Sequence, residues 1–478
     1  MIKTQASSNG TPIDPRDQRI AELETQLRER DQLIAALQEK VQHLEEELKK
    51  TKRAGKRQAA PFARKKRVAK PKRPGRKKGQ GRFSYRRKPA PEEVKETKEA
   101  ALDCCPKCGG SLTERKEHEQ FVVDIPPVEP EITRYVTHSG YCSCCQQRVR
   151  SRHADQISDA TGAAGVVVGP RAKALAVDMK HRLGLSYGKV CDLLEDAFGL
   201  RVSRGGWYQA DVRLADQAQP VYEGLVEMLR ESAVVHVDET GWRIGTLSAW
   251  LWVFTNRETT VYTIRQSRGH EVVVDILGTE FAGVLNSDCF LAYDAKALDD
   301  WLKQKCVGHL LRNLSEMEAS KTRGAVRFAR NVTALLQEAL RLKAEKPDLP
   351  AEIFTERAAR VEERLDQLIH ERRQFTDPDN ARFAKRLRKH REHLLRFLYV
   401  DELDATNNQA ERQLRPAVIT RKTTGCNRVA DGAEAHSILA SVLATCHQRA
   451  IPILDFLVEL QRAAGNPPSL GPPQPAPT

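Results

Sequence analysis

The N-terminal part of the chain carries apolar residues at alternating intervals of three and four, with Arg30 as one interruption. The positions between them are mostly Glu, Gln, Arg and Lys. This heptad pattern predicts a coiled coil over residues 15–50, and with it a homo-oligomer. A single amphipathic helix docked on the rest of the protein is the alternative. The apolar seam consists of Ile20, Leu23, Leu27, Ile34, Leu37, Val41, Leu44 and Leu48.

Helical spacing returns over residues 165–230. The stretch predicts one helix from about Ser186 to a stop near Gly199, and a second helix capped by Ser203. The short turn between them is typical of a helix-turn-helix, which would make this a DNA-binding region, or of an ordinary helical hairpin. In the first case the recognition residues lie on the second helix, with Arg204 and Arg213 as DNA contacts.

Alternation with a period of two begins at Ala233. In AVVHVDETGWRI, Val235 and Val237 point to one face and Asp238 to the other, so we expect a buried strand that ends by presenting Asp238. AWLWVFTNRETTVYTIRQSR predicts two more strands, HEVVVDIL a short helix, and AGVLNSDCFLAYD a fourth strand that ends at Asp288. This is the element order of an RNase H-like α/β fold, in which the first and fourth strands lie side by side. The first part of such a catalytic core would occupy residues 231–312.

A long helical stretch then separates these strands from the next acidic helix. Its apolar residues form three groups at helical spacing and predict an all-α insertion over residues 313–400. Its Arg and Lys residues form either a solvated face, which we favour, or a DNA surface. The last part of the core, with a closing helical pair, would occupy residues 401–464, and the Pro-rich tail 465–478 is expected to be disordered. The three groups are Phe328, Val332, Leu335, Leu336 and Ala339; Phe354, Ala358, Val361, Leu365 and Leu368; and Phe383, Leu387 and Leu394.

Charge changes this picture, because the 478 residues carry a net charge of +14 and a pI of about 9.3. Such a balance favours nucleic acid or an anionic membrane as a partner. No stretch of about 20 apolar residues is present and the N-terminus lacks the apolar core of a secretory signal, which predicts no membrane contact. We therefore expect a cytoplasmic, nucleoid-associated protein.

The densest charge lies in a basic linker over residues 51–98, which we expect to be disordered. Between Lys49 and Lys88 there are 20 Lys or Arg residues and no Asp or Glu. Such a run neutralises phosphates without reading bases, and a solvated linker is the alternative. The expected DNA contacts are Arg64, Lys65, Lys66, Arg67, Arg76, Lys77 and Lys78.

Two C-x2-C pairs stand in CCPKCGG and YCSCC, and they predict a zinc ribbon over residues 99–155. The residues between the pairs, HEQFVVDIPPVEPEITRYVTHSGY, alternate like short strands. Four thiolates close a tetrahedral Zn²⁺ site, so we expect it to be structural and not catalytic. The neighbouring thiols of Cys104 and Cys144 leave the choice of ligands open. The expected ligands are Cys105, Cys108, Cys142 and Cys145.

A third acid is found in DATNNQAERQLRPA, residues 404–417. Asn408, Glu411, Arg412 and Arg415 fall at i, i+3, i+4 and i+7, on one face of a helix. Asp238, Asp288 and Glu411 together would hold two Mg²⁺ ions (or Mn²⁺) about 3.5–4 Å apart, the arrangement of two-metal phosphoryl chemistry. Asn408 would orient a ligand, and the two arginines would contact phosphates.

Asp275 and Asp294 compete with Asp288 for the second position. Asp294 lies past the expected strand end, so Asp288 ranks higher.

At these motifs the sequence resembles the insertion sequence 66 family of transposases, of the DDE type. The resemblance covers nearly the whole chain and rests on the coiled coil, the basic segment, CPKCGG, YCSCC, HVDETGW, SDCFLAYD, CVGHLLRN and NNQAERQLRP followed by TRK. It implies that Asp238, Asp288 and Glu411 are the catalytic triad. Cys306 and His309 match the Cys-x2-His element after the second acid, for which core packing is the alternative. The stretch ITRKTTGCNRV departs from the usual pattern, so no DNA contact is carried over to Arg421 and Lys422.

The resemblance further implies a DNA transposase that binds terminal inverted repeats, cuts the 3′ ends and joins them to target DNA, with Mg²⁺ and a structural Zn²⁺ as cofactors. Small accessory proteins of the same element are possible partners. A non-catalytic DNA-binding regulator that uses the zinc ribbon and the helix-turn-helix is the alternative, and a general nuclease of the same fold is a third. Together, these elements and domains predict a multidomain α+β protein.

Overall fold

The structure is a computed structural model that describes residues 23, 26–35, 37–42, 86–114, 116–463 and 467–471. The chain divides into two units, residues 1–71 and 72–478. In the first unit the described residues are helical, and the seam residues Leu27 and Ile34 are exposed. Self-association through this seam stays a prediction. The seven Arg and Lys residues that we expect to contact DNA within 64–78 lie outside the described residues.

The cysteine-rich region of the second unit contains less strand than we predicted. After a 3-10 turn η1 (Pro91–Glu93), its strands are β1 (Ser139–Cys142) and β2 (Gln147–Arg150), which form one antiparallel hairpin. The expected strands between the two cysteine pairs do not form over residues 117–138, because the alternating apolar side chains there have no second layer to pack against. Val123 and Ile132, for example, are exposed.

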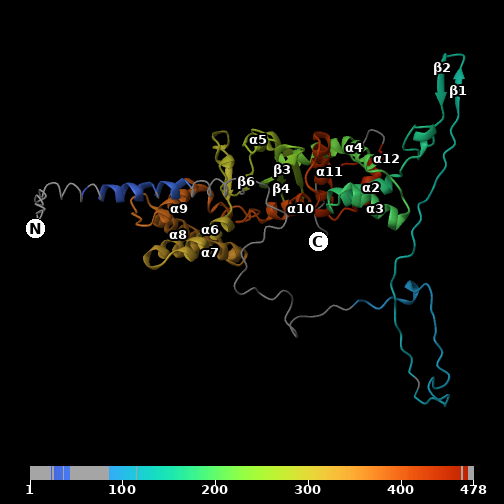
Figure 1. Cartoon of the computed structure of the whole chain (residues 1–478), viewed down its shortest axis with the longest axis horizontal. Helices are drawn as coiled ribbons and strands as arrows, with labels where there is room; N and C mark the ends of the chain where they lie inside the picture. Colours follow the sequence, from blue (N-terminus) through green and yellow to red (C-terminus); the bar gives the residue numbers. More distant parts are fainter. Residues whose placement is uncertain are drawn as a thin grey trace, which may run out of the picture. The chain divides into compact units, whose positions relative to one another are not determined.

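A five-stranded mixed sheet forms the centre of the second unit, in the order β5-β4-β3-β6-β7 (Figure 1). The first three strands are antiparallel, whereas β6 runs parallel to β3 and β7 parallel to β6. The predicted adjacency of the first and fourth strands is confirmed by the pairing of β3 with β6. The strands are β3 (Val234–Ile244), β4 (Leu247–Thr255), β5 (Thr260–Arg265), β6 (Val284–Ser287) and β7 (Leu302–Lys305).

Two features of the sheet differ from the sequence prediction. β3 does not end at Asp238 but continues to Ile244, because the residues after Asp238 pair with β4. Gly245, with a φ of 57°, supports the tight hairpin turn between the two strands. The second difference is β7, whose sequence LKQK has no apolar alternation and was not predicted.

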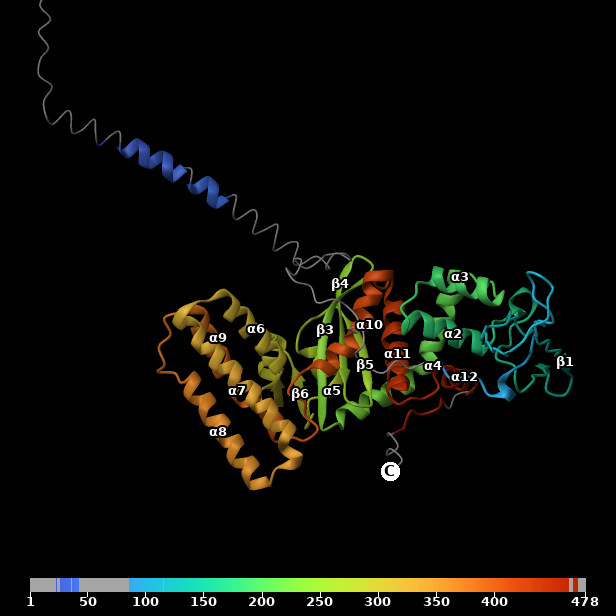
Figure 2. The same ribbon diagram turned by 90° about the horizontal axis from the view of Figure 1, so that it is seen from below.

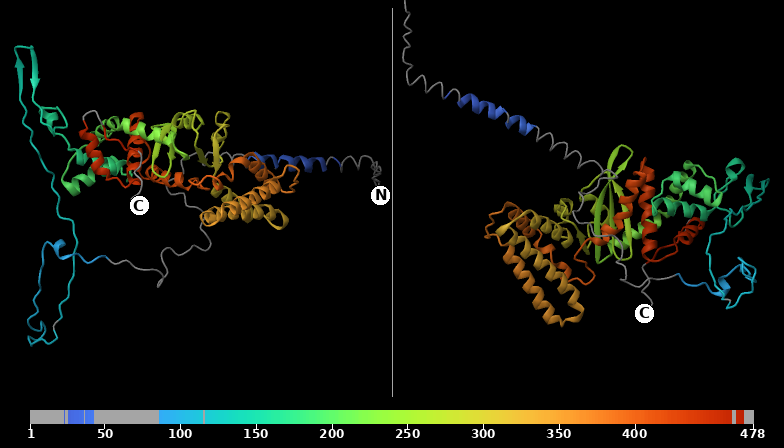
Figure 3. Two further views of the ribbon diagram at one scale, coloured as in Figure 1. Left: turned by 180° about the vertical axis from the view of Figure 1, so that it is seen from behind. Right: turned by 60° about the horizontal axis from the view of Figure 1, so that its bottom comes forward.

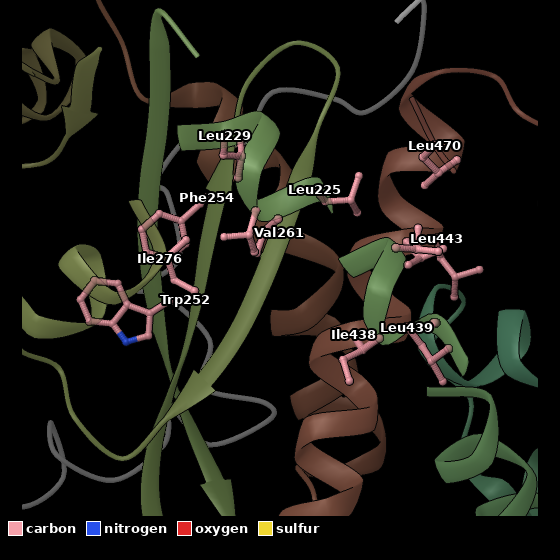
Figure 4. Packing of buried hydrophobic residues seen from close by; sticks show 14 of the residues in the cluster. Leu225, Leu229, Trp252, Phe254, Val261, Ile276, Ile438, Leu439, Leu443 and Leu470 are labelled. Atoms are coloured by element: carbon pink, nitrogen blue, oxygen red, sulfur yellow. The ribbon is translucent and has the colours of Figure 1, made fainter. Parts of the chain in front are cut away.

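One face of the sheet is covered by helices that share its largest apolar core. Figure 4 shows part of this core, with labelled side chains from β4, β5 and the covering helices. Leu470 also packs there, so the disorder that we expected of the tail does not extend to this residue. The covering helices are α2 (Pro170–His181), α4 (Arg204–Arg230), α5 (Glu271–Leu277), α11 (Ala430–Gln448) and α12 (Ile453–Arg462).

The opposite face is covered by α10 (Asn408–Thr424), the helix that carries Glu411 (Figure 2). Its residues Ala410 and Leu414 pack with Leu251 and Val253 of β4. At its other end, the Arg421 guanidinium donates to the Thr240 hydroxyl oxygen at 2.8 Å, so this side chain is committed to β3.

The predicted helical hairpin is present as α3 (Tyr187–Phe198) and α4. Ser186 and Ser203 cap the two helices through their hydroxyl oxygens, and Gly199 ends α3 with a φ of 63°. α4 then continues past the hairpin into the sheet core, where Leu225 is fully buried. The side chains of Arg204 and Arg213 are exposed, and their contact with DNA stays a prediction.

Four α-helices separate β7 from α10 and share an apolar core with Val234 and Val284 of the sheet: α6 (Val307–Ser320), α7 (Val326–Glu345), α8 (Ala351–Ile369) and α9 (Pro378–Lys389). The three predicted groups of apolar residues correspond to α7, α8 and α9. The helix predicted from the third group is too long, because α9 ends at Lys389 and the buried Leu394 lies after the 3-10 turn η7 (Arg391–His393). None of the helices in the described residues is apolar over a length that would cross a membrane.

Both edges of the sheet are closed by polar contacts, and Figure 3 shows the flanking helices from two further sides. On the β5 edge, hydroxyl groups of α11 accept the outward N–H groups of the strand. The pairs are Ile264 N–H to Ser437, Tyr262 N–H to Ser441 and Thr260 N–H to Thr445, at 3.2, 2.7 and 3.1 Å. On the β7 edge, the Gln304 side chain bonds to the backbone of Leu394 and Phe397. The β5 edge is therefore not left as a template for another strand, and the β7 edge is held to the segment after α9.

This arrangement predicts that Ser441→Ala destabilises the protein. The substitution leaves the buried Tyr262 N–H without a partner, which costs about 1–3 kcal/mol of the free energy of unfolding. Urea denaturation measures the loss. Thr423→Ala is the control, because this exposed hydroxyl bonds only to its own helix. Equal stability of the two variants would contradict the role of the α11 hydroxyl row.

Candidate active site

Asp238 lies near the middle of β3, opposite Val253 of β4. Its Oδ1 atom accepts the N–H of Glu239 at 2.9 Å. Burial, together with the carboxylates of Glu239, Asp288 and Glu411, raises the pKa of Asp238 to about 7 against the lowering effect of that hydrogen bond. Asp288 and Glu411 therefore lie close enough to Asp238 to disfavour its charge.

Asp288 and Glu411 enter this neighbourhood from different elements. Asp288 follows the last residue of β6, and its Oδ1 accepts the N–H of Phe290 at 2.8 Å, which fixes the turn after the strand. Glu411 lies in the first turn of α10. Among the residues that the structure describes, no three His, Cys, Asp or Glu side chains are grouped tightly enough to hold a metal ion.

The face of α10 that we singled out is largely open. Glu411 is half-buried, whereas Asn408, Arg412 and Arg415 are exposed. Two guanidinium groups thus stand one residue and one turn beyond the carboxylate, where they can meet an anionic ligand.

Cys306 and His309 connect α6 to this site. Cys306 is buried just before α6, which fits core packing, but its Sγ also accepts the N–H of Asn407 at 3.1 Å. His309 is partly exposed, and its Nε2 lies 3.6 Å from Oε1 of Glu411. Contact with the Cys306 thiol raises the pKa of His309 against the effect of burial, and Glu411 adds to the increase.

Asn407 was missed by the sequence reasoning, which assigned a role only to its neighbour Asn408. Asn407 is 1% exposed and precedes α10 directly. Its Nδ2 donates to Val237 O at 2.7 Å, and its Oδ1 lies 3.2 Å from Nδ1 of His236. The available signal was its position as the residue before the helix, where Asn is common and functional.

Glu239 was also missed, and it lies on the other face of β3. The Arg268 guanidinium donates to its Oε1 at 2.8 Å, and the Tyr293 hydroxyl donates to its Oε2 at 2.5 Å. Arg268 in turn stacks on the rings of Trp250 and Phe290. Burial raises the pKa of Glu239 although these donors lower it. Both carboxylate oxygens of Glu239 are therefore occupied by donors within the protein.

The two competing acids have other positions. Asp275 is exposed on α5. Asp294 forms an ion pair at 2.9 Å with the fully buried Lys305 of β7 and another at 2.8 Å with Lys389 of α9. Burial alone would raise the pKa of Asp294, but the hydrogen bonds from Lys389 and Lys305 lower it. Asp294 therefore ties the insertion to the sheet.

We predict that Asp294→Asn is strongly destabilising. It leaves the Lys305 ammonium buried without a counter-ion, which costs roughly 3–5 kcal/mol of the free energy of unfolding. Chemical denaturation checks this value. Asp275→Asn, an exposed acid with the same change, should remain within about 0.5 kcal/mol of the wild type. A stable Asp294→Asn protein would show that Lys305 does not depend on this carboxylate.

Each cysteine pair forms its own backbone turn. Gly109 N–H donates to Cys105 O at 2.8 Å, with Gly109 at a φ of 73°. Backbone N–H groups, from Lys107 and Cys108 in the first pair and chiefly from Cys145 in the second, lower the pKa of Cys105 and Cys142. Thiolates held in this way are suited to bind a metal ion.

The sequence of the chain matches two known protein families. Residues 165–435, more than half of the chain, match the family described as Transposase IS66 family. The chain belongs to this family of transposases. Residues 103–146 match the zinc-finger binding domain of transposase IS66, which supports a structural zinc in this member of the family.

A curated relative is more distant. The chain is 26% identical over 291 residues to "Uncharacterized protein y4qI" of Sinorhizobium fredii (strain NBRC 101917 / NGR234). The match covers 54% of this chain and 53% of the relative, so the chain spans about half the length of that protein.

Proposed function

We propose that this IS66 family member is a metal-dependent DNA transposase that cuts the 3′ ends of its element and joins them to target DNA. The observation that supports the proposal is that Asp288 and Glu411 each raise the pKa of Asp238. Asp238 lies in β3, Asp288 follows β6, and Glu411 lies in α10. The sheet order β5-β4-β3-β6-β7 supports an RNase H-like catalytic domain around them.

The donor set fits divalent cations. Asp288 and Glu411 disfavour the charge of the half-buried Asp238, and Mg²⁺ or Mn²⁺ would relieve that repulsion with the oxygen ligands it prefers. Asp238, Asp288 and Glu411 would hold two such ions. When bound, the metal ions activate water or a 3′-hydroxyl and stabilise the leaving oxygen.

Other side chains would act on the DNA itself. Arg412 and Arg415 are exposed on α10 and would orient the phosphate at the reacting position, whereas His309 would hold Glu411 in place from α6. The remaining DNA affinity would come from the basic linker, the zinc ribbon and the hairpin that carries Arg204 and Arg213. The coiled coil would bring in a second copy of the chain. Binding of this kind would depend strongly on salt concentration.

The proposed function predicts the effect of a substitution at Glu411 on catalysis. Glu411→Gln should abolish Mg²⁺-dependent cleavage and strand joining on DNA that carries the inverted repeats flanking the gene, because a neutral amide is a poor ligand for a hard cation. DNA binding, measured by fluorescence anisotropy, should remain. Glu434→Gln, an exposed acid on α11, is the control and should retain cleavage.

The products decide between functions. Binding without cleavage in the wild type would favour a non-catalytic DNA-binding regulator and contradict the proposal. Cleavage without strand joining would favour a general nuclease.

The second prediction concerns zinc. We expect about one Zn²⁺ per chain, held by Cys105, Cys108, Cys142 and Cys145, as in closed four-thiolate sites. Replacement of Cys108 or Cys145 by Ser should remove the metal, measured by mass spectrometry of the purified protein. Cys104→Ser and Cys144→Ser are the controls and should keep it. Zinc loss in a control variant would assign the ligands differently.

A further inference from the structure

The pairing of β3 with β6 stops short of the acids. The parallel register runs from Val234 opposite Val284 to His236 opposite Asn286. Beyond that point the sheet no longer ties the two strands together, and α10 approaches from the opposite end of a long insertion. α10 itself packs on β4 through Ala410 and Leu414, and the position of Glu411 relative to Asp238 also depends on what holds the start of this helix.

Asn407 makes that contact. Its Nδ2 donates to the carbonyl of Val237, the residue directly before Asp238, at 2.7 Å. Its own carbonyl accepts the N–H of Glu411 at 3.1 Å. One residue thus bonds to the strand beside the first acid and to the helix at the third acid.

The second atom of the amide strengthens this bridge. Because Nδ2 is occupied as a donor, Oδ1 of Asn407 acts as the acceptor, and His236 donates from Nδ1 at 3.2 Å. His236 is itself buried. Both atoms of the Asn407 amide are therefore used, in a site from which water is excluded.

Hydrogen bonds also join the backbone around Asn407 to β6 and α6, the elements next to Asp288. Asn407 N–H donates to Sγ of Cys306 at 3.1 Å, and Val307 N–H donates to Ala405 O at 2.9 Å. Asn286, two residues before Asp288, donates from Nδ2 to Asp404 O at 2.7 Å. The segment before α10 is thus attached to β6 and α6 as well as to β3.

Helix capping does not explain this side chain. Asn at the residue before a helix normally uses its side-chain oxygen to accept an N–H of the first turn. Ser186 and Ser203 do so in this protein, but the Asn407 side chain makes no such bond and reaches across to β3 instead. The amide of Asn407 instead joins the start of α10 to β3.

We infer that Asn407 is a positioning residue that sets the distance between Glu411 and Asp238 for metal binding and catalysis. This inference rests on the proposed function. Misplacement of a catalytic group by about 1 Å can cost about 100-fold in rate. Loss of the bridge should therefore reduce turnover without removing any acid or any DNA contact.

Asn407→Ser and Asn407→Asp test the inference, because both residues are good helix caps. Ser is too short to reach Val237 O, and Asp has no N–H to donate to it. We expect the cleavage rate constant to fall about 100-fold in both, with DNA affinity nearly unchanged. Mn²⁺ affinity, measured by calorimetry on the full chain without DNA, should also fall, which a purely structural defect elsewhere would not cause.

Asn380→Ser is the matched control. Asn380 is similarly buried and donates from Nδ2 to Ala325 O at 2.8 Å, but it lies on α9. This variant should lose a comparable amount of thermal stability while it keeps wild-type cleavage and Mn²⁺ affinity.

The outcomes separate this inference from the proposed function. If the wild type cleaves and binds Mn²⁺ and either Asn407 variant matches it, the positioning role is wrong and the proposed function stands. If Asn380→Ser loses cleavage to the same extent, general destabilisation explains the result and the inference is wrong. If the wild type neither cleaves nor binds Mn²⁺ in a manner sensitive to Glu411→Gln, the proposed function is wrong and the inference fails with it.

Discussion

Parallel pairing between β3 and β6 is the constraint on which the candidate active site depends. It places Val234 opposite Val284 and His236 opposite Asn286, so that the chain carries Asp238 and Asp288 forward from neighbouring strands. β4, β5 and α5 lie between them in sequence, and the pairing across the sheet brings the two strands that lead to the acids together. Burial leaves little water between the carboxylates, which is why the pKa of Asp238 rises to about 7.

The helical insertion lengthens the chain between the second and third acids without separating them. α6 to α9 share an apolar core that also includes Val234 of β3 and Val284 of β6, so the insertion packs against the sheet. The two ends of the insertion are anchored by polar contacts. Lys305 and Lys389 meet at Asp294, and Asn286 holds the backbone at Asp404. These buried, directional contacts fix where α10 begins.

Buried polar groups also define the limits of the sheet. The α11 hydroxyl row satisfies the N–H groups of β5, and Gln304 joins β7 to the segment after α9. A purely apolar helix on the β5 edge would leave those N–H groups unpaired, at a cost that a stable domain avoids. The same elements therefore end the sheet and attach the neighbouring helical regions to it.

Local signals in the sequence determined the elements: helix caps at Ser186 and Ser203, the strand and helix order from Ala233 to Asp288, and the family, through its cysteine pairs and acidic motifs. These signals act over a few residues, so they are readable without the fold. The length of β3, the strand β7 and the absence of strands over residues 117–138 depend on partners distant in sequence, which no local pattern contains. The roles of Asp294 and Asn407 were likewise decided only by tertiary structure. Asp294 and Asn407 acquire their roles from buried partners that are distant in sequence, Lys305 and Val237.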